Sequence, residues 1–133
     1  MRLWLMVGLG GALGSMLRLA VGRGFQWLGW QGAFPWSTYA VNSLGSLGLG
    51  LLAGWLSSEQ QGSALQVSRL EYLQAFVGMG LMGGFTTYST FNLDLLKLLE
   101  EGHRLRALAY ASLTLASALV GGILGLWLGR RGC

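Results

Sequence analysis

Charged side chains are scarce in this sequence. They make up 11% of its 133 residues, whereas an ordinary soluble domain carries about 25%. So few charges cannot cover a water-facing surface, which argues against a soluble globular domain. The apolar share of 53% also excludes intrinsic disorder, which requires low hydrophobicity and high charge.

Cysteine and proline are nearly absent. The single cysteine, Cys133, excludes an internal disulfide framework and a thiolate metal cluster. One proline beside 23 glycines that follow no three-residue period excludes collagen. The net charge of +4 comes from nine Lys and Arg residues against five acids. In so apolar a chain, this excess predicts contact with a membrane surface rather than with nucleic acid.

Long uncharged runs are what the sequence has instead. Residues 36–56, 73–93 and 107–129 carry no charge, and residues 3–22 are interrupted only by Arg18. Each run is close to the roughly 20 residues that a helix needs to cross a bilayer, and none has a polar face at helical spacing. Tryptophans stand at or near the ends of these runs, as expected of rings at the headgroup level.

The runs predict an all-α membrane protein, multi-pass in a cell membrane, in which residues 1–133 form a single transmembrane domain surrounded by the lipid bilayer. The four transmembrane helices are expected at about residues 3–22, 36–56, 73–97 and 107–129. The N-terminal run could also be a secretory signal peptide, but it is long for one, and a retained first helix is favoured.

Basic residues divide almost evenly between the two sides of such a bundle. Four spans put both termini on one side, which then holds Arg2, Arg69, Arg130 and Arg131. The other side holds Arg18, Arg23, Lys97, Arg104 and Arg106. The positive-inside rule needs an imbalance to choose an orientation, so we expect the chain to insert both ways round. Two oppositely oriented copies could then pair about a two-fold axis in the membrane plane, as an antiparallel homodimer.

Glycines recur at four-residue spacing along the predicted spans. The sets are Gly10 and Gly14, Gly50 and Gly54, Gly80 and Gly84, and Gly121, Gly125 and Gly129. Small residues at this spacing let helix backbones approach closely, which is how helices associate in lipid. The spacing therefore predicts tight packing of the helices within the chain and between chains.

The third run contains the least regular stretch of the sequence, Gly83–Phe91, which reads GGFTTYSTF. Adjacent glycines weaken a helix, and Ser and Thr side chains can take over freed backbone groups. A break near the middle of this third helix would leave carbonyls between Gly83 and Thr87 without intrahelical partners, and such carbonyls can coordinate a small cation. A glycine-rich packing face with hydroxyls bonded back to the helix explains the pattern equally well.

Two other spans carry polar side chains. Asn42 lies inside the second span, where an amide must line a polar path or join two helices. Tyr110, Thr114 and Ser117 share a face of the fourth span, either as a hydroxyl stripe or as hydroxyls bonded to their own helix. Asp94, at the end of the third span, is expected at the interface. No span centre carries Asp, Glu, Lys or His, and no nucleophile–base pair appears, so an enzyme is not predicted.

Three motifs follow one another along the chain: GALGSMLR at Gly11–Arg18, NSLG at Asn42–Gly45 and GGFTTYSTF at Gly83–Phe91. With these motifs the sequence resembles the fluoride channels of the Fluc family, also called CrcB, over essentially its whole length. The resemblance implies a dual-topology antiparallel homodimer in a bacterial plasma (inner) membrane. It also implies two fluoride pores and a structural Na⁺ ion, which is not transported, at the point where the third helices break and cross.

The resemblance assigns roles by position. The sodium ligands would be the backbone carbonyls of Gly83 and Thr86 from both chains, and Arg18 would belong to the basic region at the pore mouth. The residues that match the fluoride pore are Asn42, Tyr88, Ser89, Thr90, Phe91, Tyr110, Thr114 and Ser117. Tyr88 stands where the family usually has Phe, which keeps the ring edge and adds a hydroxyl. Ser117 is expected to replace a family hydroxyl that would fall at Ala118.

The predicted function is a fluoride-specific ion channel that exports cytosolic fluoride passively, down its electrochemical gradient, and so relieves fluoride toxicity. Amide and hydroxyl donors replace the water that fluoride holds strongly, aromatic edges face the anion, and neutral donors let the ion leave again. One alternative is a small multidrug-type transporter, which would need a membrane-embedded Glu that the first span lacks. The other is a non-transporting membrane assembly subunit, which would not need the hydroxyl-rich run.

Overall fold

The computed structural model is all-helical in the part of the chain that it describes, residues 1–30, 32, 34–59 and 64–131. Three helices are long: α1 (Arg2–Trp27), α2 (Trp36–Glu59) and α6 (Arg104–Arg131). A run of four shorter elements connects α2 to α6. These are α3 (Ala64–Leu73), η1 (Gln74–Met82), α4 (Gly83–Phe85) and α5 (Tyr88–Glu100). The element η1 is a π-helix.

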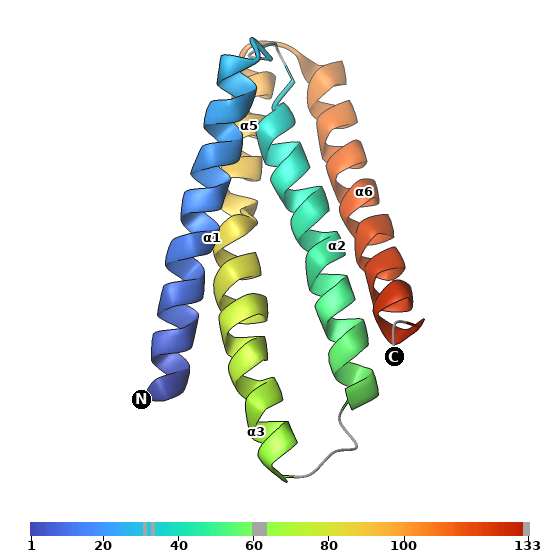
Figure 1. The fold of residues 1–133 in the computed structure, drawn as a ribbon. Helices are drawn as coiled ribbons and strands as arrows, with labels where there is room; N and C mark the ends of the chain where they lie inside the picture. Colours follow the sequence, from blue (N-terminus) through green and yellow to red (C-terminus); the bar gives the residue numbers. More distant parts are fainter. Residues whose placement is uncertain (31, 33, 60–63, 132–133) are drawn as a thin grey trace.

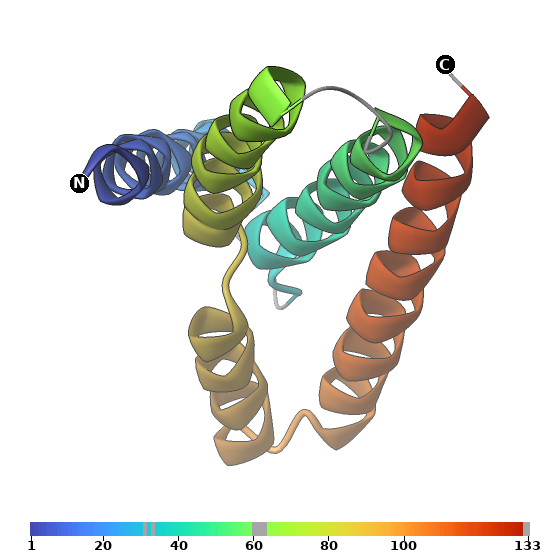
Figure 2. The same ribbon diagram turned by 90° about the horizontal axis from the view of Figure 1, so that it is seen from below.

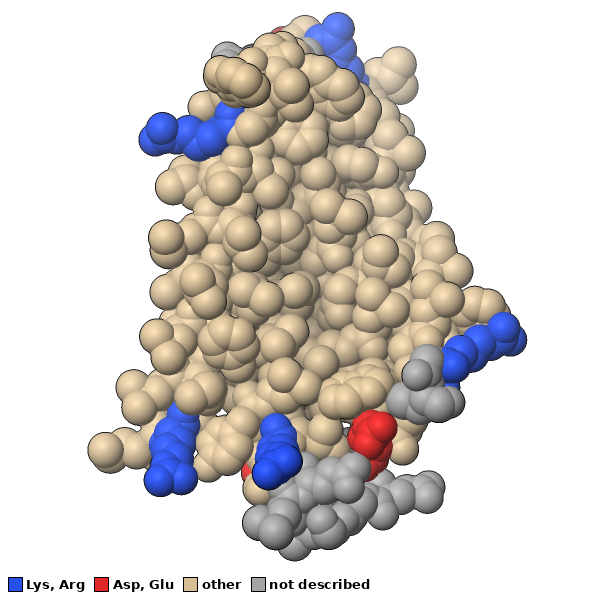
Figure 3. Space-filling view, viewed as in Figure 1, with Lys and Arg blue, Asp and Glu red and all other residues tan. Residues whose placement is uncertain are grey.

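The three long helices are each, by length and composition, apolar enough to cross a membrane, and they coincide with three of the four predicted spans. Residues 73–97, where the sequence predicts a third helix broken near its middle, are divided among the end of α3, η1, α4 and most of α5, and α3 extends the helical run back to Ala64. In the view of Figure 3, the charged residues lie near the two ends of the molecule, with a broad uncharged belt between them. This distribution suits a bilayer around the belt.

The helices run roughly alongside one another, and both chain ends lie at the same end of the bundle (Figure 1). The column formed by α3, η1 and α4 lies against α1, and α2 lies against α6 (Figures 1 and 2). The element α5 is the part of the column that follows the interruption, and it packs against α6. The result is two packed pairs of helices, with the interruption of one column in the middle of the bundle (Figure 2).

Glycines form the contact between α1 and the η1–α4 column. A Cβ atom on Gly80 would lie 2.8 Å from Gly10 Cα and 2.8 Å from the carbonyl oxygen of Val7. A Cβ on Gly84 would lie 3.1 Å from Gly11 Cα. All of these neighbours are backbone atoms, which cannot move aside as a flexible side chain would. The close approach therefore depends on glycine, as the four-residue spacing predicts.

The pair α2–α6 uses the same kind of contact. A Cβ on Gly129 would lie 3.0 Å from Gly54 Cα, and one on Gly125 would lie 2.8 Å from the backbone nitrogen of Leu51. This packing holds the polar side chains of α2 and α6 next to each other near the centre of the bundle, since Ser43 and Ser117 are joined by a hydrogen bond of 2.7 Å between their hydroxyl oxygens.

Candidate functional site

The site is built around two residues with extended backbone, Thr86 and Thr87, which separate α4 from α5. Their φ and ψ angles are −79° and 158° at Thr86 and −154° and 117° at Thr87. Thr87 is the N-cap of α5, because its hydroxyl accepts a hydrogen bond of 3.2 Å from the Thr90 backbone nitrogen. The same hydroxyl lies 3.0 Å from the Thr90 hydroxyl. A threonine that caps the following helix thus fixes where α5 begins.

Asn42 of α2 takes over the backbone hydrogen bonds that the interruption exposes. Its Oδ1 accepts from the Thr87 N–H over 2.8 Å, and its Nδ2 donates to the Thr87 carbonyl over 3.1 Å. The side-chain amide therefore bonds both the N–H and the carbonyl of Thr87, as a neighbouring strand in a β-sheet would. One turn later on α2, a Cβ on Gly45 would collide with the Thr86 side chain. The NSLG motif thus supplies both the partner and the space that the extended backbone requires.

The carbonyls of Gly83 and Thr86 are among those that lose their usual helical donors at the interruption. In a continuous helix the Thr87 N–H would donate to the carbonyl of Gly83, but here it donates to Asn42. The Thr90 N–H would donate to the carbonyl of Thr86, but here it donates to the Thr87 hydroxyl. The Thr86 carbonyl instead accepts from Arg18 Nη1 over 3.3 Å. Gly83 and Thr86 are thus two of the residues whose carbonyl oxygens lose their helical donors at the interruption, and the Thr86 oxygen has Arg18 as a new donor.

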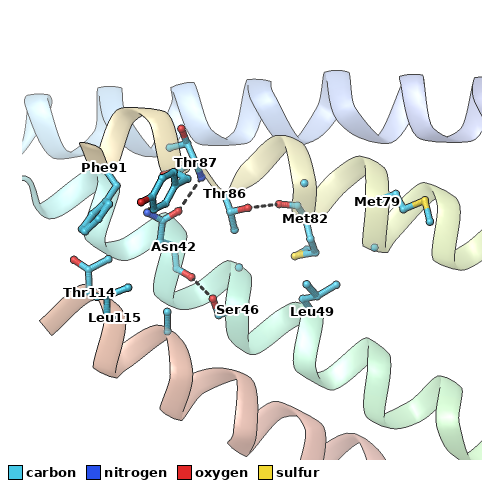
Figure 4. A pocket seen from close by; sticks show the side chains of 15 residues that line it. Asn42, Ser46, Leu49, Met79, Met82, Thr86, Thr87, Phe91, Thr114 and Leu115 are labelled. Atoms are coloured by element: carbon cyan, nitrogen blue, oxygen red, sulfur yellow. Dashed lines mark hydrogen bonds between the residues drawn. The ribbon is translucent and has the colours of Figure 1, made fainter. Parts of the chain in front are cut away.

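A cavity of about 350 Å³ adjoins the interruption, between α2, α6 and the η1–α5 column (Figure 4). Six of the residues predicted to form sites line it: Asn42, Gly83, Thr86, Tyr88, Phe91 and Thr114. Asn42, Phe91 and Thr114 lie at one end of the cavity, and Leu49, Met79 and Met82 lie at the other (Figure 4). The cavity therefore has a polar and aromatic end beside Thr87 and an apolar end farther along the bundle.

Thr114 carries an unpaired polar atom at the polar end. The residue is 4% exposed, and among the described residues its Oγ1 finds no hydrogen-bond partner. A buried hydroxyl without a partner is costly, and this hydroxyl is able to donate or to accept a hydrogen bond. The helix α5 begins at Tyr88, which lines the same cavity. The first N–H groups of a helix have no intrahelical acceptor, and its N-terminus carries partial positive charge. This end of the cavity favours an anion.

Three aromatic rings lie in a row from the cavity into the bundle. The centroids of Tyr88 and Phe91 are 5.9 Å apart, and those of Phe91 and Tyr110 are 5.1 Å apart. Phe91 and Tyr110 are buried, whereas Tyr88 is 72% exposed. Tyr110 contacts the cavity only through Phe91, because it belongs to the cluster behind the wall rather than to the lining.

A second depression of about 370 Å³ lies on the other side of Thr87. It is lined by Arg18 and Arg23 of α1, by Thr38 of α2 and by Thr90, together with other residues of α1 and α2. Thr87 lines both this basic depression and the neutral cavity. The two hollows therefore adjoin at one residue, with positive charge on one side and uncharged donors on the other.

Three predicted pore residues line neither hollow: Tyr110, which lies behind Phe91, and Ser89 and Ser117. Ser89 is exposed on the first turn of α5, where its hydroxyl is 3.3 Å from that of Thr87. Ser117 is bonded to Ser43 of α2 and donates to the carbonyl of Thr114 over 3.2 Å. The structure thus gives Ser117 a role in joining α2 to α6 within the chain.

Two residues that shape the site, Asp94 and Thr87, are not identified as such from the sequence. Asp94, expected at the interface, accepts a hydrogen bond of 2.7 Å from the Thr38 hydroxyl and lies 3.5 Å from the hydroxyl of Tyr110. Thr87 carries the interruption but was treated as one hydroxyl among several. A threonine directly before a helix with apolar residues at helical spacing is an N-cap signal, and it could have identified Thr87.

The fold and the site together define a class: a multi-pass helical membrane protein whose polar groups converge on an interrupted helix in mid-bundle. Residues 5–129 match the family model described as CrcB-like protein, Camphor Resistance (CrcB). Because the match covers nearly the whole chain, the chain belongs to the CrcB family.

Three bacterial relatives carry the name Fluoride-specific ion channel FluC. The protein of Hyphomonas neptunium is 42% identical over 132 residues, which is 96% of this chain and 95% of the relative. The protein of Erythrobacter litoralis is 41% identical, over 93% of this chain and 89% of the relative. The protein of Novosphingobium aromaticivorans is 38% identical, over 92% of this chain and 89% of the relative.

Proposed function

We propose that this protein is a fluoride-specific ion channel of the plasma (inner) membrane of a bacterium, and that it lets cytosolic fluoride leave passively down its electrochemical gradient. The observation that carries the proposal is the neutral set of polar residues at one end of the cavity, where Asn42, Thr87 and Thr114 line the wall. The names of the relatives support fluoride as the anion. No catalytic group is needed, because the ion is moved without a chemical step.

The cavity provides what a strongly hydrated anion needs when it gives up its water. Thr114 offers an O–H donor, Asn42 has a second Nδ2 hydrogen beyond the one used for Thr87, and α5 offers its first N–H groups. Ring edges such as that of Phe91 carry partial positive charge. None of these groups is a full positive charge, so the anion is bound weakly enough to leave again. The basic depression at Arg18 gathers anions before they reach the neutral segment.

We further propose that the interrupted column α3–α5 is a fourth membrane-spanning segment with a break at Thr86 and Thr87, and that two chains pair antiparallel. Ser89, Thr90 and Asn92 are exposed on the first turns of α5. Polar side chains and irregular backbone at membrane depth need protein or water to cover them. The near equality of basic residues on the two sides supports insertion in both orientations. A second, inverted copy of this chain is the covering partner.

A sodium ion at the centre of this dimer would use the carbonyls that the interruption releases. Gly83 and Thr86 each offer an oxygen without its helical donor, and two chains would offer four. Hard oxygen ligands suit a hard monovalent cation, and carbonyls of interrupted membrane helices are known to serve this purpose. The ion would hold the two breaks together and add positive potential to the pore. The Arg18 guanidinium, bonded to the same Thr86 carbonyl, would share that oxygen with the ion.

Sodium removal is expected to loosen the dimer. Exchanging Na⁺ for N-methyl-D-glucamine at constant ionic strength should lower the midpoint of thermal unfolding by several degrees, because a ligand present at about 100 times its Kd stabilises a protein by about 2.7 kcal/mol. Thermal unfolding of the purified protein in detergent, followed by tryptophan fluorescence, measures the shift. K⁺ at the same concentration is the matched control. Equal midpoints in all three salts would contradict a structural sodium site.

Replacing Thr114 with valine is expected to move stability and flux in opposite directions. Valine has the same shape and removes an unpaired hydroxyl, so the free energy of unfolding should be unchanged or raised by up to about 1 kcal/mol. Fluoride flux should fall about 10-fold or more, because a hydrogen bond to a charged group is worth about 1.5–3 kcal/mol. Ser112→Ala, an exposed hydroxyl on the same helix, is the control. A valine variant with undiminished flux would remove Thr114 from the pore.

Growth of bacteria tests the function in the cell. A strain that lacks its own fluoride exporter is grown on medium with rising fluoride, with and without this chain. We expect the chain to restore growth at fluoride concentrations that stop the parent strain, and the Thr114→Val variant to restore it less well. Failure to restore growth by a chain that is present in the membrane fraction would argue against fluoride export.

A further inference from the structure

A chain of aromatic contacts links the α1–α2 connection to the cavity wall. From the connection inward, the centroids of neighbouring rings are 5.8 Å apart for Trp30–Trp36, 4.4 Å for Trp36–Phe34 and 5.4 Å for Phe34–Tyr110. Tyr110 then contacts Phe91 over 5.1 Å. These spacings fall within the range of favourable aromatic pairs. The rings therefore form a continuous path from residues outside the membrane-spanning helices to the pore.

Phe34 is the ring at which this path enters the bundle. It meets Tyr110 nearly perpendicular, with an angle of 89° between the two ring planes. It packs against the buried cluster of Phe91, Leu98, Ala107 and Tyr110, yet it lines neither the cavity nor the basic depression. Any influence of Phe34 on an ion must therefore pass through Tyr110.

Tyr110 needs such a neighbour to hold its orientation. The ring is completely buried, and its hydroxyl lies 3.5 Å from Asp94 Oδ2. A well-formed O–H···O bond is about 2.7–2.8 Å long, so the Asp94 contact by itself constrains the ring weakly, and Thr38 is a second hydrogen-bond partner of the hydroxyl. Phe34 on one side and Phe91 on the other are thus the closest rings that fix its tilt.

The chain directly after α1, at residues 28–30, has a defined backbone conformation. Gly29 adopts a φ of +73°, and the backbone nitrogen of Trp30 donates to the carbonyl of Phe25 over 3.0 Å. The Gly29 nitrogen donates to the carbonyl of Gln26 over 3.1 Å. This paired closure of a helix end, with a residue of positive φ, is the Schellman arrangement that favours glycine. It fixes the direction in which Trp30 leaves α1.

We infer that Phe34 is a positioning residue for anion selectivity: it sets the tilt of Tyr110, and Tyr110 sets the edge that Phe91 presents to the ion. The inference rests on the proposed fluoride channel. An edge presented at the correct angle attracts an anion, whereas the ring face repels it. Loss of the Phe34 ring lets Tyr110 and Phe91 change their tilt without removing any donor from the pore.

The test compares substitutions of Phe34 with a matched substitution at Phe25. Phe34→Leu should lower the ratio of fluoride to chloride flux about 2- to 10-fold, the factor that corresponds to the worth of one aromatic pair. Phe25→Leu removes a ring that contacts Trp30 but not Tyr110, so the ratio should not change. Phe34→Tyr keeps the ring and should keep the wild-type ratio. Phe34→Met, which fills the space without a ring, is measured alongside in case the leucine variant fails to assemble.

Double variants separate positioning from a general loss of stability. In a Tyr110→Phe background the effect of Phe34→Leu should persist, because the ring that transmits it remains. In a Tyr110→Leu background it should disappear, because the two substitutions then interrupt the same path. A wild-type protein that conducts fluoride, with an unchanged ratio in both Phe34→Leu and Phe34→Met, would overturn the inference. A wild-type protein that conducts no fluoride would overturn the proposed function instead.

Discussion

Replacing Asn42 with leucine is expected to lower fluoride flux at least about 10-fold and to lower the free energy of unfolding by about 2–4 kcal/mol. Leucine is similar in size but satisfies neither the N–H nor the carbonyl of Thr87, which Asn42 bonds over 2.8 and 3.1 Å. Each buried polar group left without a partner costs about 1–3 kcal/mol. The same substitution removes a donor from the cavity wall, so both stability and flux should fall.

Asn42→Asp separates the two roles of the amide. Aspartate keeps an oxygen for the Thr87 N–H but loses the Nδ2 donor, so about half of the stability loss should remain. Flux should stay as low as in the leucine variant, because no Nδ2 hydrogen is left for the anion. Unfolding in detergent and efflux from liposomes measure the two quantities. Ser57→Ala, which removes a hydroxyl bonded within the same helix, is the control, and wild-type flux in Asn42→Leu would refute the assignment.

Gly10→Ala should destabilise the protein by about 2–3 kcal/mol and deplete the folded protein in membranes. A Cβ at this position would lie 2.9 Å from the Leu81 backbone nitrogen and 3.0 Å from Gly80 Cα, and overpacking of this kind typically costs 1–3 kcal/mol. The helices α1 and η1 would have to separate, and the column that holds Gly83 and Thr86 would move with η1.

Gly8→Ala is the matched control for this variant, since the two glycines lie two residues apart on α1. A Cβ on Gly8 meets no atom within 4 Å in the described part of the chain, so stability should stay the same or rise slightly through better helix propensity. Fluorescence-detected size-exclusion chromatography after heating compares the two variants. Equal stability of both would show that α1 does not rely on the glycine contact.

The sequence predicts those features of the fold that are determined within one continuous stretch of residues. Three membrane-length helices follow from uncharged runs, because a bilayer imposes the same length on every span. The glycine contacts follow from four-residue spacing, since Gly80 and Gly84 necessarily share a face of their column. The weak point at Gly83–Phe91 is also visible locally, because adjacent glycines and four hydroxyl residues contradict a regular membrane helix.

The parts that were missed depend on segments far apart in the chain. Asn42 and Thr87 are 45 positions apart, and no spacing rule indicates that a side-chain amide pairs with that backbone unit. Asp94 is expected at the interface because it stands at the end of the third run, and its partners, Thr38 and Tyr110, lie on two other helices. Phe34 lies in a connection, where hydropathy gives no sign that a ring reaches the buried cluster. Tertiary contacts decide these roles, and one sequence does not reveal them.

Fluoride efflux from liposomes tests the central claim most directly. Liposomes that contain the purified protein and Na⁺ are loaded with fluoride or with chloride, and release is started with an ionophore that balances charge and followed with an ion-selective electrode. We predict rapid release of fluoride, while chloride leaves no faster than from protein-free liposomes. Release of neither ion, from protein shown to be dimeric, would contradict the channel and favour a drug transporter or an assembly subunit. Equal release of both ions would contradict its specificity for fluoride.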